Sequence, residues 1–330
     1  MPDAIVLRRL TKTFGQTVAV SDLDLVVPQG ALYGVIGPNG AGKTTAIRMI
    51  LSIILPDSGD LAVLGHRSAL EAKDRIGYLP EERGLYKKMR VAQFLTYLAQ
   101  LKNADGEDLP RRIEHWLERV GLAGAGKKRC DELSKGMQQK VQFVSAVLHR
   151  PDLLILDEPF SGLDPVSQRQ LRDLVREEHR RGATVLFSTH VMTHAEQLCD
   201  HVVMIHRGKK VLDDGIQSIR ARYSPRSLLF EPLNPDADLQ PLGGLRGVAR
   251  ARQEGSAWEL CLAEGADPAR VIRDVAMTVP PARIELRRPT LEDVFVDIVT
   301  GGDEAGVEDS MLREAVRDDA DGTGGREARL

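Results

Sequence analysis

A glycine-rich stretch that ends in Lys-Thr-Thr carries the strongest chemical signal in this sequence. It fits G-x-x-x-x-G-K-[ST], a pattern that binds nucleoside triphosphates when it follows a strand and opens a helix. Its glycines let the backbone curl, so that successive N–H groups point at phosphate oxygens, and the helix start adds positive potential. We predict that nucleotide is bound by Gly37, Pro38, Asn39, Gly40, Ala41, Gly42, Lys43, Thr44 and Thr45. Lys43 is expected at the β- and γ-phosphates, and the Thr44 hydroxyl at Mg²⁺.

Two carboxylates, Asp157 and Glu158, follow a run of four apolar residues in the stretch LLILDEP. Beside a phosphate loop, an Asp at the end of such a strand holds Mg²⁺ directly or through water. Glu158 projects differently, and we expect it to polarise a water molecule for attack on the γ-phosphate. Positioning and charge stabilisation supply most of the barrier reduction in phosphoryl transfer. The two motifs together predict hydrolysis of a nucleoside triphosphate.

Strand and helix patterns alternate through residues 1–223, and they must position these groups. We predict buried strands at 31–37, 152–159 and 183–190, two short strands at 201–212, and a helix at 43–54. Alternating strands and helices indicate an α/β fold with a parallel sheet covered on both faces. The strand signal stops between 85 and 150, which indicates a helical insert with helices at 91–102 and 110–122.

Clustered Pro, Gly and Asp residues after position 223 mark a boundary, and residues 224–300 are expected to form a small α+β domain. Its pattern predicts a hairpin at 248–262, a helix at 267–277, a strand at 282–288 and a final helix capped by Thr290. Residues 301–330 hold nine Asp/Glu and four Arg and almost no aromatic residues. Such a tail buries too little apolar surface to order itself, apart from a possible short helix at 309–317.

Composition excludes several classes of protein. No apolar run reaches the roughly 20 residues that span a bilayer, and the first residues lack the apolar core of a signal peptide. The net charge is −3, of which the tail contributes −5, so residues 1–300 carry +2. This nearly neutral balance, without clustered Lys/Arg faces, does not fit a nucleic-acid-binding protein. We therefore expect a cytoplasmic chain.

The motifs as a set resemble the ATP-binding-cassette (ABC) superfamily of P-loop NTPases over residues 4–223. Residues 37–45 look like the Walker A motif, and 153–158 look like Walker B with its catalytic glutamate, Glu158. The family features also include the D-loop at 161–164, the switch histidine His190, an adenine-stacking aromatic at Phe14, and the signature motif LSKGMQQK at 133–140. The resemblance implies an ABC-type ATPase domain that uses ATP and Mg²⁺.

The resemblance also implies a dimer and explains a glycine that is otherwise unfavourable. Gly136 lies in the first turn of a predicted helix, where it costs about 1 kcal/mol relative to alanine. In the family two subunits pair head to tail, so Ser134 and Gly136 would approach the γ-phosphate bound by the second copy. Asp164 would act across the dimer contact, and His190 would contact the γ-phosphate of its own chain. A homodimer with two ATP molecules at its interface follows.

Two positions depart from the family pattern. The commonest signature is LSGGQ, whereas Lys135 and Met137 replace its first Gly and its Gln here. Ser134 and Gly136 are retained, so contact with the γ-phosphate is still expected. The glutamine of the family's Q-loop falls on Glu81, which can reach Mg²⁺ or the attacking water but brings a negative charge and no amide donor.

The stretches at 77–86 and 289–301 resemble a narrower branch, the sodium-efflux and drug-export type of ATP-binding subunit with a small C-terminal domain. This resemblance implies an exporter. Because the chain carries no span, it would energise a separate polytopic permease from the cytoplasmic face of the cell membrane. The segment from Glu81 to Met89 would couple ATP-driven closure to that permease.

Two other readings remain open. A soluble mechanical ATPase of the same superfamily would act in translation or DNA repair, but the sequence has one phosphate loop and no sustained heptad region. Alternatively, residues 224–300 might regulate the protein by binding a ligand. That segment contains no metal-ligand or nucleophile constellation, so a packing or dimer-stabilising role is the simpler interpretation.

Overall fold

A computed structural model describes residues 2–82, 84–223, 227–255, 257–263, 265–287 and 289–300. The described chain forms two compact units, which divide between Ile216 and Gln217. Their division falls at the start of α7 (Ile216–Arg222), ahead of the boundary that the sequence predicts after residue 223. The predicted acidic tail, 301–330, with its short helix at 309–317, lies outside the described residues.

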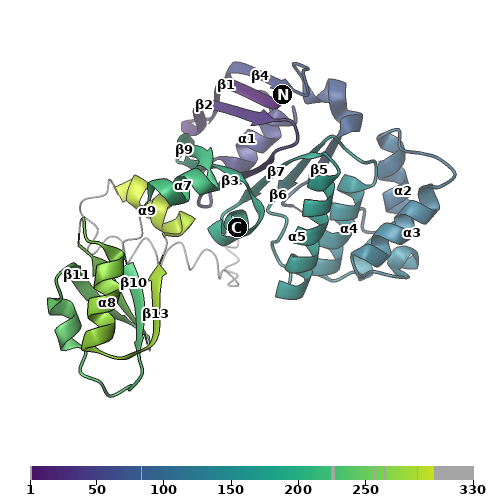
Figure 1. The fold of residues 1–330 in the computed structure, drawn as a ribbon. Coiled ribbons are helices and arrows are strands. Elements are labelled where there is room, and N and C mark those ends of the chain that lie inside the picture. Colours follow the sequence, from purple (N-terminus) through teal and green to yellow (C-terminus); the bar gives the residue numbers. More distant parts are fainter. Residues whose placement is uncertain are drawn as a thin grey trace, which may run out of the picture. The chain divides into compact units, whose positions relative to one another are not determined.

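A six-stranded sheet forms the centre of the first unit (Figure 1), in the order β5-β6-β7-β3-β8-β9. The strands are β5 (Ile76–Leu79), β6 (Leu153–Asp157), β7 (Thr184–Thr189), β3 (Leu32–Ile36), β8 (His201–His206) and β9 (Lys209–Gly215). The first five are parallel, and β9 pairs antiparallel with β8. Every residue of β3, β6 and β7 is buried, as expected for strands covered on both faces. The predicted α/β fold with a parallel sheet is confirmed.

A second, antiparallel sheet precedes and flanks the phosphate loop, in the order β2-β1-β4. It consists of β1 (Asp3–Phe14), β2 (Thr17–Pro28) and β4 (Ser58–Val63). The sequence analysis did not identify these strands. Their apolar alternation is interrupted by register shifts, one of them between Leu7 and Leu10, where Arg9 adopts a φ of 46°. Their inward side chains join one core with α1 and the six-stranded sheet.

The helices of the first unit cover the central sheet and form the helical insert. They are α1 (Lys43–Ile50), α2 (Val91–Leu101), α3 (Leu109–Arg119), α4 (Lys135–Val147), α5 (Pro165–Arg180) and α6 (Met192–Leu198), with short 3₁₀ turns η1 (Ala69–Arg75), η2 (Ala125–Lys127) and η3 (Cys130–Glu132). In the insert, α2, α3 and α4 pack together, and Trp116 meets Phe143 edge to face. The helix predicted at 43–54 ends earlier, at Ile50, because the chain turns at Ser52, whose φ is 56°.

The second unit is a four-stranded antiparallel sheet with helices, in the order β11-β12-β10-β13. Its elements are β10 (Ser227–Pro232), η4 (Gln240–Gly244), β11 (Val248–Glu254), β12 (Ala257–Leu262), α8 (Pro268–Thr278), β13 (Pro281–Arg287) and α9 (Leu291–Thr300). Phe230, Leu260 and Val275 are fully buried in its core. The predicted hairpin and α8 are present, and the Thr290 hydroxyl caps α9 by accepting the Asp293 N–H at 3.2 Å. Within the described residues, no helix of either unit is both long and apolar enough to cross a membrane.

Candidate functional site

The phosphate loop connects β3 to α1, and two of its glycines lie too close to neighbouring backbone to carry a side chain. At Gly37 (φ 150°) a Cβ would lie 2.1 Å from the Ile205 carbonyl oxygen. At Gly42 (φ 106°), which caps α1, it would lie 2.3 Å from the Ala19 carbonyl oxygen. The positive φ angles of these two residues are a second reason for glycine, because residues with a side chain rarely adopt them. The loop is therefore closely held between β8 and β2.

Lys43, the first residue of α1, folds back over this loop. Its side chain is only 6% exposed, and Nζ donates to the carbonyl oxygens of Gly37 at 2.8 Å and Pro38 at 3.1 Å. The same Nζ lies 3.9 Å from Oε1 of Glu158. A buried cation is thus held by backbone carbonyl oxygens next to the acidic end of β6, where a polyphosphate would neutralise it.

Asp157 ends β6 and is completely buried. Its Oδ1 accepts hydrogen bonds from the Thr44 hydroxyl at 3.3 Å and from the Ser188 hydroxyl. Its Oδ2 is buried with no hydrogen-bond partner, and burial raises the pKa of this carboxyl. A bound cation would satisfy that oxygen and favour the ionised carboxylate. The pair Thr44–Asp157 therefore fits a Mg²⁺ site, since oxygen donors are the ligands that Mg²⁺ prefers.

Glu158 adopts a φ of 47° and is 7% exposed. Its Oε1 accepts hydrogen bonds from the backbone N–H and from Nδ1 of His190, each at 2.8 Å. Because an ionised carboxylate only accepts, Nδ1 of His190 must carry a hydrogen. His190 and Glu158 are thus joined directly, across the ends of β6 and β7.

A cavity of about 560 Å³ lies over the phosphate loop. It is lined by Thr17, Val18, Ala19, Asn39, Gly40, Ala41, Gly42, Lys43, Thr44, Thr45, Glu81, Glu158 and Arg207. The structure therefore brings most of the predicted loop residues together with Glu158 and Glu81. Oε2 of Glu81 is 3.5 Å from the Thr44 hydroxyl, so the Q-loop position faces the predicted metal ligands. Asp157 and His190 do not line the cavity themselves. They form hydrogen bonds to two residues that do, Thr44 and Glu158 respectively.

Phe14, Ser134, Gly136 and Asp164 are among the predicted residues that do not line this cavity. Phe14, at the end of β1, is 48% exposed, with Nζ of Lys12 5.5 Å from its ring centre. Ser134 caps α4 by accepting the Met137 N–H at 3.3 Å, and Gly136 lies in the same helix turn. Asp164 caps α5 by accepting two N–H groups. Hydrogen bonds from the Ser167 side chain and backbone lower the pKa of Asp164.

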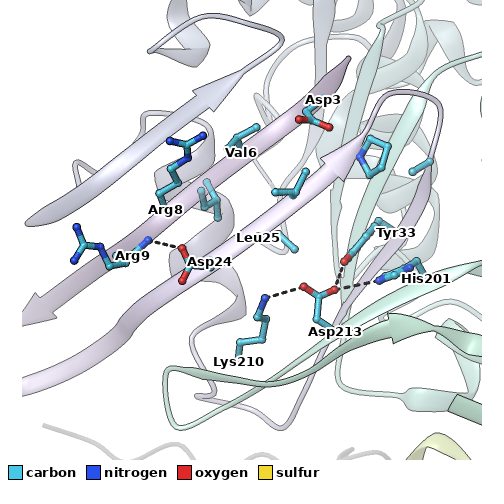
Figure 2. Close-up of a pocket in the computed structure, with 14 residues that line it drawn as sticks. Asp3, Val6, Arg8, Arg9, Asp24, Leu25, Tyr33, His201, Lys210 and Asp213 are labelled. Carbon is cyan, nitrogen blue, oxygen red and sulfur yellow. Dashed lines mark hydrogen bonds and ion pairs between the residues drawn. The ribbon is translucent and has the colours of Figure 1, made fainter. Parts of the chain in front are cut away.

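A larger cavity, of about 870 Å³, lies at the other end of the strands (Figure 2). There Tyr33, His201 and Lys210 converge on the carboxylate of Asp213. Tyr33 and His201 lie near the amino ends of β3 and β8. Because ligands of parallel α/β sheets bind outside the carboxyl ends of the strands, the smaller cavity is the candidate site.

The sequence analysis did not identify two residues of this site, Ser188 and Arg207. Ser188 stands two positions before His190 and contacts Asp157 because the parallel register of β6 and β7 pairs these residues. Arg207 belongs to the turn between β8 and β9, within the range where the sequence predicts two short strands. No spacing within the chain connects either residue to the phosphate loop, so local patterns contained no signal for them.

Comparison with known proteins shows which family the chain resembles. The family model described as ABC transporter matches residues 20–161. The chain is 38% identical to the uncharacterized ABC transporter ATP-binding protein YhaQ of Bacillus subtilis (strain 168), an alignment that covers 89% of this chain and 98% of the relative. It is 32% identical to the daunorubicin resistance ATP-binding protein DrrA3 of Streptomyces coeruleorubidus, over 91% of this chain and 96% of that one.

A solved structure, described as the ATP binding subunit of an ABC transporter, superposes with a TM-score of 0.63 at 31% identity. The superposition covers 67% of this chain and 93% of the other. The resemblance expected from the sequence, including the drug-export branch, is confirmed by these relatives.

Proposed function

The chain belongs to the ATP-binding subunits of the ABC transporter family, and on that premise we propose that it drives an exporter by closing with a second copy over two ATP molecules. As a member of this family it binds ATP and hydrolyses it to ADP and phosphate in the service of transport. The observation that carries the proposal is the Asp157–Glu158 pair, which lies buried against Lys43 and Thr44 of the phosphate loop.

In the proposed reaction a water oxygen attacks the γ-phosphorus. The bond between the γ-phosphorus and the oxygen that bridges it to the β-phosphorus breaks, and ADP leaves with that oxygen. Glu158 is the general base that orients this water and accepts its proton. All of its described side-chain hydrogen bonds go to Oε1, which leaves Oε2 for the water. Lys43 and the N–H groups of the loop stabilise the negative charge on the transferred phosphoryl group.

We assign Mg²⁺ to Asp157 and the Thr44 hydroxyl, with Glu81 facing them. Bound there, the ion would neutralise charge on the phosphate oxygens. The orphaned Oδ2 of Asp157 supports this assignment, because a buried carboxylate oxygen without a partner is costly in a protein that lacks a ligand for it.

The dimer part of the proposal rests on the start of α4. Ser134 is exposed, and neither Ser134 nor Gly136 lines the cavity of its own chain. A helix start with open backbone N–H groups is well suited to an anion brought by another molecule. In the proposed closed dimer, this end of α4 contacts the γ-phosphate held by the partner copy, and Asp164 lies at the same interface.

The transport part rests on the relatives and on one surface. DrrA3 is named for daunorubicin resistance, which fits an outward direction of transport, and we extend that direction to this chain. Tyr86, which precedes α2, and Tyr97, which lies within α2, are exposed aromatic residues that pack edge to face. We propose that they receive a cytoplasmic segment of a separate polytopic permease, which would hold the chain at the inner face of the cell membrane.

Glu158→Gln tests both the proposed role of Glu158 as general base and the proposed ATP-driven dimer. The amide keeps the size of the side chain but cannot accept the proton, so we expect kcat to fall by about 10²- to 10⁴-fold while ATP binding is retained. Phosphate release measures the first quantity, and binding of a fluorescent ATP analogue measures the second. Light scattering should show that ATP and Mg²⁺ convert this variant from monomer to dimer.

The matched control is Glu118→Gln, an exposed glutamate of α3, which should hydrolyse ATP at the wild-type rate. Phosphate release by Glu158→Gln equal to the wild type would refute the base role. A Glu158→Gln variant that binds ATP but stays monomeric would refute the closed dimer.

A further inference from the structure

One buried hydroxyl contacts both acidic residues of the site, one through its carboxylate and the other through its backbone N–H. Ser188, at the end of β7, is completely buried and pairs with Asp157 in the parallel register of β6 and β7. Its hydroxyl donates to Oδ1 of Asp157. Oγ of Ser188 also accepts a hydrogen bond from the backbone N–H of Glu158 at 3.2 Å. A serine side chain has one hydrogen to donate, so these two bonds determine its orientation.

We propose that Ser188 is a positioning residue that decides which oxygen of Asp157 is presented to the metal and that holds Glu158 in its strained backbone conformation. This inference rests on the proposed function, because it assumes Mg²⁺ at Asp157 and a water at Glu158. Nothing in the motifs of the sequence assigns a role to this serine.

The effect on Asp157 follows from the distribution of donors. Thr44 and Ser188 both donate to Oδ1, whereas Oδ2 is buried without a partner. With Oδ1 occupied twice, rotation of the carboxylate would break two hydrogen bonds inside the protein. Ser188 therefore keeps Oδ2 as the open ligand before any ion arrives, which lowers the cost of ordering the site on binding.

The effect on Glu158 concerns its backbone. A φ of 47° is uncommon for a residue with a side chain and is energetically unfavourable. In this conformation its N–H points toward β7, where Ser188 Oγ supplies the acceptor. His190, two residues further along, donates twice to the side chain of the same glutamate. The end of β7 thus holds both the backbone and the carboxylate of Glu158.

Ser188→Ala removes the hydroxyl and tests this role through metal binding as well as turnover. Loss of such an outer hydrogen bond typically weakens metal affinity or activity by about 10- to 100-fold. We expect the dissociation constant of Mn²⁺, measured by electron paramagnetic resonance in the presence of ADP, to rise by at least about 10-fold. Nucleotide affinity in EDTA should stay at the wild-type value, because Lys43 and the loop N–H groups do not depend on Ser188.

Two further variants separate positioning from general stability. Thr184→Val removes another buried hydroxyl from β7, one that accepts the Gly30 N–H at 2.9 Å at the far end of the strand. It should lower the melting temperature without changing Mn²⁺ affinity. Ser188→Thr keeps a hydroxyl at the same position and should restore Mn²⁺ affinity to within a few-fold of the wild type.

Wild-type Mn²⁺ affinity in Ser188→Ala would overturn the inference, whatever its melting temperature. An equal loss of Mn²⁺ affinity in Thr184→Val would overturn it as well, because destabilisation alone would then explain the effect. These failures differ from failure of the proposed function, in which the wild-type protein itself would show no metal-dependent hydrolysis of ATP.

Discussion

At the scale of single residues, packing within the chain does not explain the glycine at position 136. A Cβ at this position would lie 3.5 Å from Cδ2 of Leu163 and 3.6 Å from the Gly162 carbonyl oxygen, which are ordinary packing distances. Its own fold therefore admits an alanine, which would favour the helix. The absence of a side chain is explained if an anion or a second subunit approaches this turn.

We therefore predict that Gly136→Ala separates stability from activity. Urea unfolding should show a protein as stable as the wild type or more stable by about 0.5–1 kcal/mol, because alanine is the better helix former. Phosphate release should nevertheless fall by about 10-fold or more, since the added methyl group would block the close approach that an oxyanion contact needs.

Gly126→Ala is the matched control, because a Cβ at Gly126 would also make only ordinary contacts, at 3.4 Å from Cβ of Ala92. That variant should retain full hydrolysis. Wild-type turnover in Gly136→Ala would contradict the proposed role of this turn.

At the scale of elements, the order of the strands determines which part of a nucleotide meets which side chain. β3 leads into the phosphate loop, with β7 and then β6 on one side of it and β8 on the other. Glu158 follows β6, whereas Arg207 follows β8 in a turn whose Gly208 N–H donates to the Ala41 carbonyl oxygen at 2.9 Å. In the proposed reaction the γ-phosphate is the group that reacts, and we expect it to lie near Glu158. Arg207 should therefore meet the part of the nucleotide that does not react.

Arg207→Ala should accordingly remove binding energy that ATP and ADP share. We expect KM for ATP and the inhibition constant of ADP to rise by the same factor, about 5- to 10-fold, with kcat unchanged. Steady-state phosphate release with added ADP measures all three constants.

Arg150→Ala provides the comparison, because Arg150 is also an exposed turn residue with a positive φ, 56°, but does not line the cavity. A fall in kcat without a change in KM for Arg207→Ala would place Arg207 at the reacting phosphate and contradict the argument from strand order.

At the scale of the whole molecule, two half-buried histidines link stability to pH. Burial, reinforced by the charge of Lys102, lowers the pKa of His149 to about 4, and burial beside Arg172 lowers that of His194 to about 4. Both are neutral in the folded protein, whereas the unfolded chain takes up protons near pH 6.5. Their contribution to stability is therefore fully present above pH 6.5 and is lost as pH falls toward 4. The raised pKa of Asp157 acts in the opposite direction and offsets part of this loss.

We predict that the free energy of unfolding of the wild type falls between pH 6.5 and 4.5, with each histidine contributing up to about 1 kcal/mol per pH unit. His149→Gln keeps an N–H that can donate to the Ile76 carbonyl oxygen, the partner of Nε2 in the native protein, and it removes the titration. Urea unfolding at several pH values should show a shallower slope for the variant. An unchanged slope would exclude His149 as a source of the acid sensitivity.

The sequence was most informative where function depends on consecutive residues. The glycine loop between a strand and a helix, the carboxylates after an apolar run and the cap at Thr290 were all readable, because each is encoded within about ten positions. The antiparallel sheet of β1, β2 and β4 was missed, because register shifts in β1 break the alternation on which strand recognition depends.

What the sequence determined by itself is therefore the chemistry of the phosphate loop and of the acidic strand end. Only the tertiary structure decided that Ser188 faces Asp157, that His190 holds Glu158, and that Arg207 lines the nucleotide cavity. The physical reason is that the register of parallel strands is determined by the packing of segments that are distant in sequence. No local pattern of residues contains that information.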